Sequence, residues 1–205
     1  MTPLRFYIAR VMRNEALLAS LSVPQADLLA DLAGRSVALV GNARALADGD
    51  HGAAIDRHDL VIRINRAPMP LAHSHGSRTD WLALATSLRP EDRDRLGKPR
   101  ILWMSPKRKR LARRDAHSPG FYLHPLADYN RLHDLLRAPP TTGAMMIDLL
   151  ARSDLDHLTL FGFDFFTSLS LSGRRRADQV PHDFRAEAGF VQGLMRHDPR
   201  IDLIR

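Results

Sequence analysis

The sequence contains no cysteine, only 6% aromatic residues and no apolar run long enough to cross a bilayer. Without cysteine, disulfides and thiolate metal sites are excluded, which suits a reducing compartment. A transmembrane helix needs about 20 consecutive apolar residues. Residues 1–21 are interrupted by Arg5, Arg10, Arg13 and Glu15. We therefore expect a cytoplasmic protein with neither a membrane anchor nor a signal peptide.

Glycine-rich phosphate-binding motifs are also missing. After Gly41 the chain continues with Asn42 and Ala43, without the second and third glycine of the dinucleotide fingerprint. No phosphate-loop lysine motif occurs anywhere in the sequence. These absences argue against NAD, FAD and nucleoside triphosphate hydrolysis, and we expect no cofactor.

Positive charge exceeds negative charge. The 205 residues include 30 lysines and arginines against 23 aspartates and glutamates, a formal net charge of +7. Such an excess predicts an anionic partner or substrate. The charge is concentrated in residues 106–119 and 167–181, which we expect to be loops. The length and the 44% hydrophobic composition suit one compact domain over residues 1–205.

Short apolar stretches alternate with helical patterns, which predicts an α/β fold. The strand candidates are residues 36–40, 60–64, 81–85, 101–104 and 158–163. The best helices are residues 126–137, 143–152 and 184–196, and residues 1–33 form an N-terminal helical segment. We expect a single Rossmann-like, mostly parallel sheet with helices on both faces.

Two local patterns have the residue types that a ligand or catalytic site needs. Gly41 and Asn42 follow the first strand, and open parallel sheets bind ligands where their strands end. The alternative for this pair is an ordinary turn. His182 stands at the start of a helix, with Glu187 five residues later. This histidine suits either a general base or a helix-capping residue.

An acidic pair at Asp48 and Asp50 has the spacing of a DxD metal site. The same spacing recurs at residues 92–94 and 154–156, so the pattern has little specificity. Solvated loop carboxylates are the simpler interpretation. We predict that the protein has no metal site.

Taken together in chain order, these segments resemble the sialyltransferases of glycosyltransferase family 29. The large motif of that family is resembled by VGN at residues 40–42, IDRHDLVIRINRAP at residues 55–68 and GSRTD at residues 76–80. The small motif is resembled by residues 140–143 and 160–164, and the very small motif by His182 with Glu187. The resemblance covers residues 37–187 and implies a variant of the GT-A fold.

The resemblance implies an inverting, metal-independent transfer of sialic acid or a related acid sugar. The donor is a CMP-sugar, and the acceptor is a hydroxyl of a glycan or glycolipid. His182 is the implied general base. The residues implied to bind the donor nucleotide are Asn42, Asn65, Thr141, Thr142, Gly143 and Gly162. No metal is implied, because the helix N-terminal amides after Thr142 can stabilise the charge of the departing CMP.

The sequence also departs from the family pattern. Val37 and Leu155 stand where animal members carry a disulfide, and no aromatic motif with a leading histidine is recognisable in residues 165–181. The Golgi anchor and stem are missing as well, which favours a bacterial-type soluble enzyme. Residues 161–166 also resemble the sialyltransferases of family 42.

Three alternatives stay open. A CMP-Kdo-type transferase would use the same nucleotide motifs, and a non-catalytic nucleotide- or anion-binding module would keep them without transfer. The basic residues 107–114 and 174–176 suit a solvated loop or a peripheral contact with an anionic inner membrane. Nucleic acid is not expected, because no aromatic residues alternate with these charges to stack on bases.

Overall fold

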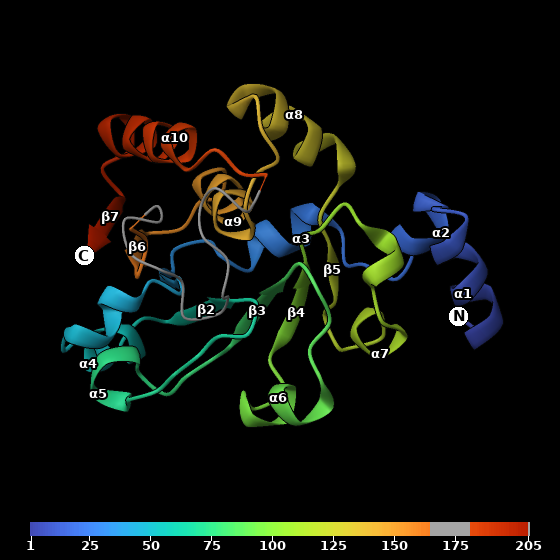
Figure 1. Ribbon diagram of the computed structural model, residues 1–205, viewed down its shortest axis with the longest axis horizontal. Coiled ribbons are helices and arrows are strands. Elements are labelled where there is room, and N and C mark those ends of the chain that lie inside the picture. The colour runs from blue at the N-terminus through green and yellow to red at the C-terminus, as the bar shows by residue number, and fades with distance from the viewer. Residues whose placement is uncertain (165–180, 205) are drawn as a thin grey trace.

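The computed structural model describes residues 1–164 and 181–204 (Figure 1). In these residues seven parallel strands form one sheet in the order β5-β4-β3-β2-β1-β6-β7. The strands are β1 (Ser36–Val40), β2 (Leu60–Ile64), β3 (Trp81–Leu84), β4 (Arg100–Trp103), β5 (Tyr122–Leu123), β6 (His157–Phe161) and β7 (Ile201–Ile204). The predicted α/β fold is confirmed, and the described sheet is entirely parallel.

Successive strands are added first on one side of β1 and then on the other, while all of them stay parallel. Strands β1 to β5 progress toward one edge of the sheet, and the chain then returns to place β6 on the other side of β1. The return passes through α8 (Leu126–Leu136) and α9 (Thr142–Ala151), and α10 (Phe184–His197) connects to β7. The topological switch point of the sheet therefore lies between β1 and β6.

Helices cover both faces of the sheet, which explains why β1 and β2 are almost continuous apolar runs. Val37 and Leu39 of β1 belong to a cluster with α9, α10, α8 and α3 (Gln25–Ala30). Ala38 and Val40 point to the opposite face, toward η1 (Arg44–Asp48) and α4 (Gly52–Asp56). Leu155 lies in the same cluster as Val37, so the two positions that the resemblance equates with a disulfide are both buried in apolar surroundings.

On the sheet face to which Ala38 and Val40 point, strands β3, β4 and β5 are covered by three further helices. These helices are α1 (Pro3–Val11), α2 (Glu15–Ala19) and α7 (Arg113–Ala116). The remaining short helices are α5 (Ala72–His75), α6 (Pro90–Arg95) and η2 (Arg108–Arg110). No helix in the described part of the chain is both long and apolar enough to cross a membrane.

The basic stretch at residues 106–119 differs from the expected solvated loop. It contains η2 and α7, and Arg108 is only 2% exposed. The Arg108 guanidinium pairs with Glu15 at 3.0 Å and donates to the carbonyl oxygens of Ser105 and His124. A buried arginine needs such a full set of acceptors. Most of the second basic stretch, including residues 174–176, lies outside the described residues.

Candidate active site

The carboxyl ends of β1 and β6 meet at the switch point, where open α/β sheets bind their ligands. The backbone N–H of Gly41 donates to the Phe161 carbonyl oxygen at 2.7 Å, and Ala43 donates to that of Gly162 at 3.1 Å. A Cβ atom at Gly41 would overlap the Gly162 carbonyl oxygen, and Gly162 itself has a φ of +67°. Glycine is therefore required at both positions for the two loops to approach.

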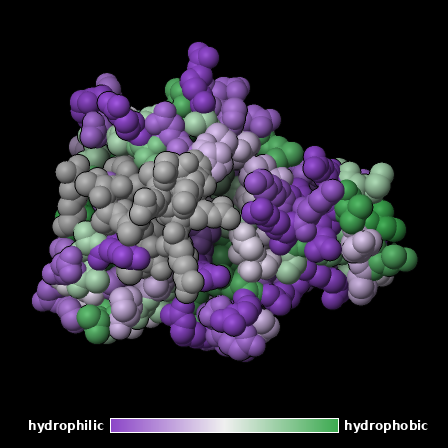
Figure 2. Space-filling view, in the orientation of Figure 1, coloured by the Kyte–Doolittle hydropathy of each residue, from purple (hydrophilic) through white to green (hydrophobic). Residues whose placement is uncertain are grey.

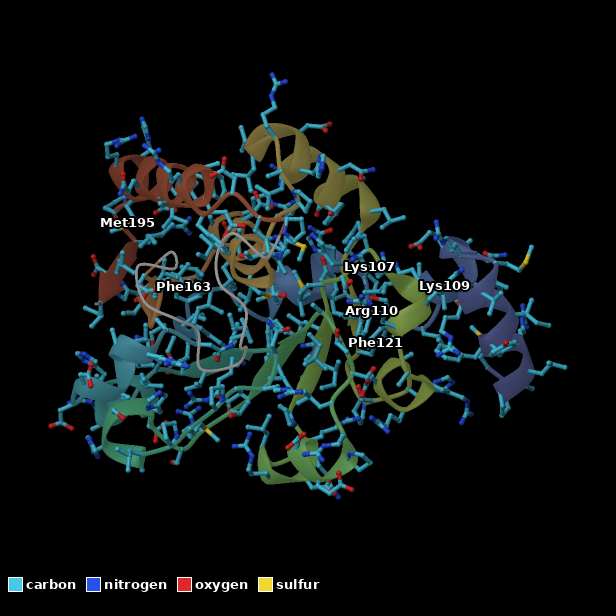
Figure 3. The ribbon with its side chains drawn as sticks, viewed as in Figure 1. Lys107, Lys109, Arg110, Phe121, Phe163 and Met195 are labelled. Atoms are coloured by element: carbon cyan, nitrogen blue, oxygen red, sulfur yellow. The ribbon has the colours of Figure 1, made fainter. Side chains whose placement is uncertain are left out.

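The first turn of α9 lies against the end of β6. A Cβ atom at Gly143 would stand 2.7 Å from the Phe163 ring, which points toward α9 (Figure 3). Thr141 is the N-cap of α9, and its Oγ1 accepts from the Ala144 N–H at 3.1 Å. The positive end of the helix dipole and the free N–H groups of its first turn therefore lie beside the switch point, as an anion site requires.

Asn42 and Asn65 follow β1 and β2, and each uses one amide atom within the protein. Nδ2 of Asn42 donates to the Ile64 carbonyl oxygen at 3.2 Å, while Oδ1 of Asn65 accepts from the Ala85 N–H at 3.1 Å. Asn65 has a φ of +53°, a conformation that asparagine tolerates better than most residues. Oδ1 of Asn42 and Nδ2 of Asn65 make no hydrogen bond with the described residues, so each side chain retains one polar atom for a ligand.

The segment that starts α10 is held to the loop before α9. His182 Nδ1 lies 2.6 Å from the Pro139 carbonyl oxygen. A carbonyl oxygen only accepts, so Nδ1 carries the proton and Nε2 of the neutral ring has a free lone pair. Nε2 has no hydrogen-bond partner among the described residues. The contact thus selects the tautomer that a general base at Nε2 needs.

Glu187 of α10 binds the same loop at Thr141, two residues after Pro139. Glu187 is 4% exposed, and its carboxyl group accepts from the Thr141 N–H at 2.7 Å and the Thr141 Oγ1 hydroxyl at 2.8 Å. Burial raises the pKa of Glu187 to about 7, although the two Thr141 bonds act in the opposite direction. Glu187 therefore positions Thr141, and through it the N-terminus of α9, and its two side-chain hydrogen bonds are both to Thr141 and not to His182.

Glu187→Gln should remove a pH dependence of stability while keeping the fold. The stability contributed by proton uptake at Glu187 is fully present below pH 4.5 and is lost as the pH rises through about 7. We expect the wild type to lose up to about 1 kcal/mol per pH unit in this window, and the variant to lack this slope. Denaturant titrations between pH 5 and 8 measure it. Glu91→Gln on exposed α6 is the matched control, and equal slopes in wild type and Glu187→Gln would contradict the assignment.

The large-motif residues mainly support the end of β2. The buried Arg63 guanidinium donates to the carbonyl oxygens of His75 and Arg78, and its pKa falls to about 10 because burial outweighs the attraction of Asp56. It remains a cation at neutral pH. The Asp56 carboxylate accepts from the N–H groups of Ser77 and Arg78. This network holds residues 76–80 beside β2 and so places Asn65.

The structure thus brings together most of the predicted site residues around the switch point. Asn42 and Gly162 lie in the two loops that meet at the ends of β1 and β6. Gly143 lies against the ring of Phe163, which follows Gly162, and Thr141 is hydrogen-bonded to Glu187 of α10. Sequence reasoning missed Phe163 as the residue that joins these segments, although its place directly after a strand-end glycine was visible. Among the described residues no group of three or more histidine, aspartate or glutamate side chains is arranged to hold a metal, so Asp48 and Asp50 gain no third ligand.

The chain matches the family described as glycosyltransferase family 29 (sialyltransferase) over residues 5–99. None of the curated proteins compared with the chain matches it.

Solved sialyltransferase structures share the fold. A mammalian sialyltransferase in complex with Gal-beta-1-3GalNAc-ortho-nitrophenol has a TM-score of 0.68 at 17% identity, covering 98% of this chain and 84% of that chain. A second structure of a mammalian sialyltransferase has a TM-score of 0.64 at 20% identity, covering 83% and 69%. A variant of the sialyltransferase CST-II in complex with CMP has a TM-score of 0.55 at 13% identity, covering 82% and 80%. The family match covers residues 5–99, just under half of the chain, and the solved structures share the fold, so the chain is similar to the sialyltransferases of glycosyltransferase family 29.

Proposed function

We propose that this protein is a CMP-sugar-dependent glycosyltransferase that moves sialic acid or a related acid sugar to a hydroxyl of a glycan or glycolipid. The observation that carries the proposal is the position of His182, whose Nε2 has no hydrogen-bond partner in the described part of the chain and whose Nδ1 is held by the loop that starts α9. A base and an anion-binding helix N-terminus are the two groups that such a transfer needs. Support also comes from the family match and from similar structures that hold CMP in one case and a disaccharide derivative in another.

In the proposed reaction the acceptor oxygen attacks the anomeric carbon of the donor sugar, and its proton passes to His182 Nε2. The bond between that carbon and the CMP phosphate oxygen breaks, and CMP leaves with the bonding electron pair. Attack on the side opposite the leaving group inverts the anomeric configuration. The N–H groups in the first turn of α9 stabilise the phosphate, which makes a metal ion unnecessary for this step.

The donor nucleotide is proposed to occupy the switch point. Oδ1 of Asn42 and Nδ2 of Asn65 are available for its ribose and phosphate, and Thr141, Thr142 and Gly143 surround the phosphate end. Gly162 keeps the β6 loop close to the β1 loop. Because these residues contact the nucleotide, a CMP-Kdo-type donor would use the same site, and the sugar has to be identified with a panel of CMP-sugars. Peripheral contact with an anionic membrane is a separate proposal, because it does not depend on the nucleotide site.

CMP should raise the melting temperature of the protein, and EDTA should not abolish the effect. A ligand at 100 times its Kd stabilises the native state by about 2.7 kcal/mol. For a chain of this size that is a rise of roughly 5–10 °C. A thermal-shift series with CMP, CTP, UDP and NAD measures it, and we expect no shift with UDP or NAD. A shift that requires both UDP and a divalent metal would sink the CMP proposal and bring Asp48 and Asp50 back as ligands.

A further inference from the structure

An apolar helix face is exposed at one end of the molecule. Of the seven large apolar side chains exposed among the described residues, five belong to α1 and its C-cap, at 42% to 73% exposure. They are Leu4, Tyr7, Ile8, Val11 and Met12. At 100° per residue these positions span an arc of roughly 140° on one side of the helix. Contiguous apolar surface of this kind marks an interaction site in a soluble protein.

The opposite side of α1 is already occupied by the core. Phe6 and Ala9 are buried in the cluster that includes Leu111, the Phe6 ring packs edge-on against the His117 ring, and Arg10 donates to the Leu111 carbonyl oxygen at 3.1 Å. Thr2 caps the helix by accepting from the Arg5 N–H. The helix is therefore fixed to the domain, and its exposed face is a rigid surface.

Positive charge borders this face. Residues 1–14 and 107–114 contain no aspartate or glutamate. Lys107, Lys109 and Arg110 are exposed on and before η2, which packs beside α1, and their side chains have no ion-pair partner among the described residues. Figure 2 shows the apolar surface over α1 next to a strongly hydrophilic patch, and Figure 3 places the three labelled cations there. Glu15, the nearest acid in the sequence, is neutralised by Arg108.

We propose that α1 and the η2 cations form a docking surface for an anionic lipid bilayer. An apolar helix face with a basic border is the pattern of a helix that lies in the membrane interface. The cations meet anionic headgroups while Leu4, Ile8 and Met12 enter the acyl boundary. A soluble acidic protein would match the charges but would not need five exposed apolar side chains.

The surface lies beyond edge strand β5, at the opposite end of the sheet from β6 and β7 (Figure 1). A bilayer bound there would leave the switch point uncovered. A role of this surface in bringing the enzyme to lipid-linked acceptors rests on the proposed function. The lipid binding itself does not rest on that function. The two proposals therefore fail independently, because one is read from vesicle binding and the other from CMP binding.

Vesicle co-sedimentation tests the surface. The protein should bind phosphatidylcholine vesicles that contain phosphatidylglycerol, bind pure phosphatidylcholine weakly, and dissociate at high salt. Ile8→Gln with Met12→Gln should weaken binding about tenfold or more, because glutamine keeps the helix but does not enter the acyl region. Leu71→Gln with Leu135→Gln removes two exposed apolar residues elsewhere and should leave binding unchanged.

The charge contribution has its own pair of variants. Each cation near an anionic membrane strengthens binding about fivefold, so replacing Lys107, Lys109 and Arg110 with glutamine should cost about 100-fold. Replacing three exposed cations elsewhere, Lys98, Arg137 and Arg196, is the control with equal net charge. Equal losses in the two triple variants, or no binding to anionic vesicles, would overturn the proposal. So would a dimer in light scattering that the α1 variant abolishes, which would assign the face to a second copy of the chain.

Discussion

His182→Ala should lower the rate of sugar transfer about 10²- to 10⁴-fold, the usual loss when a general base is removed. The fold and the CMP-induced stabilisation should remain, since the imidazole acts on the acceptor hydroxyl and its one described hydrogen bond is to the Pro139 carbonyl oxygen. The measurement pairs CMP affinity with turnover of a CMP-sugar, with water as the acceptor where no glycan substrate has been identified.

Two further variants separate a catalytic role from a positioning role. His182→Asn places an amide N–H near the position of Nδ1, so it can keep the Pro139 contact without supplying a base at Nε2. We expect it to be as slow as the alanine variant. His197→Ala is the matched control on the same helix, because its Nδ1 also contacts a carbonyl oxygen, that of Gly193 at 2.8 Å. Wild-type turnover in His182→Ala, or its restoration in His182→Asn, would exclude His182 as the base.

Gly41→Ala should abolish the response to CMP and destabilise the protein. The added Cβ atom would overlap the Gly162 carbonyl oxygen, which belongs to the backbone and cannot swing away as a side chain does. Overpacking of this kind costs about 1–3 kcal/mol, or a fall in melting temperature of roughly 2–12 °C for a chain of this size. The β1 and β6 loops must separate, which displaces Asn42 and Phe163 from the places where the donor nucleotide is proposed to bind.

The control for this variant is Gly189→Ala in α10. A Cβ atom there meets nothing within 4 Å, and alanine is the better helix former, so we expect unchanged or slightly higher stability. Thermal melts with and without CMP compare the two variants. A Gly41→Ala protein that still gains stability from CMP as the wild type does would show that close approach of the two loops is not needed for nucleotide binding.

The local sequence alone determined those strands and helices whose apolar pattern or cap residue can be recognised along the chain. β1 and β2 are apolar runs between polar segments, and α9 starts at a threonine cap, so both kinds of element were predictable within a residue or two. β5 and β7 were missed. β5 has only two residues. β7 has the polar Asp202 between apolar neighbours, and it directly follows residues 198–200, whose residue types indicate a turn. Their strand structure depends on pairing with β4 and β6.

The residues proposed for the site were chosen from the sequence, because their types and order resemble one family. What each of them contacts was decided by the tertiary structure. Arg108 looked like one of several solvated cations until Glu15, 93 positions earlier, was placed against it. Glu187 gained its role from Thr141, 46 positions away, and His182 its tautomer from Pro139. Such pairings arise from the order of the strands and the crossover to β6, and a pattern that repeats every two or four residues carries no information about contacts at that separation.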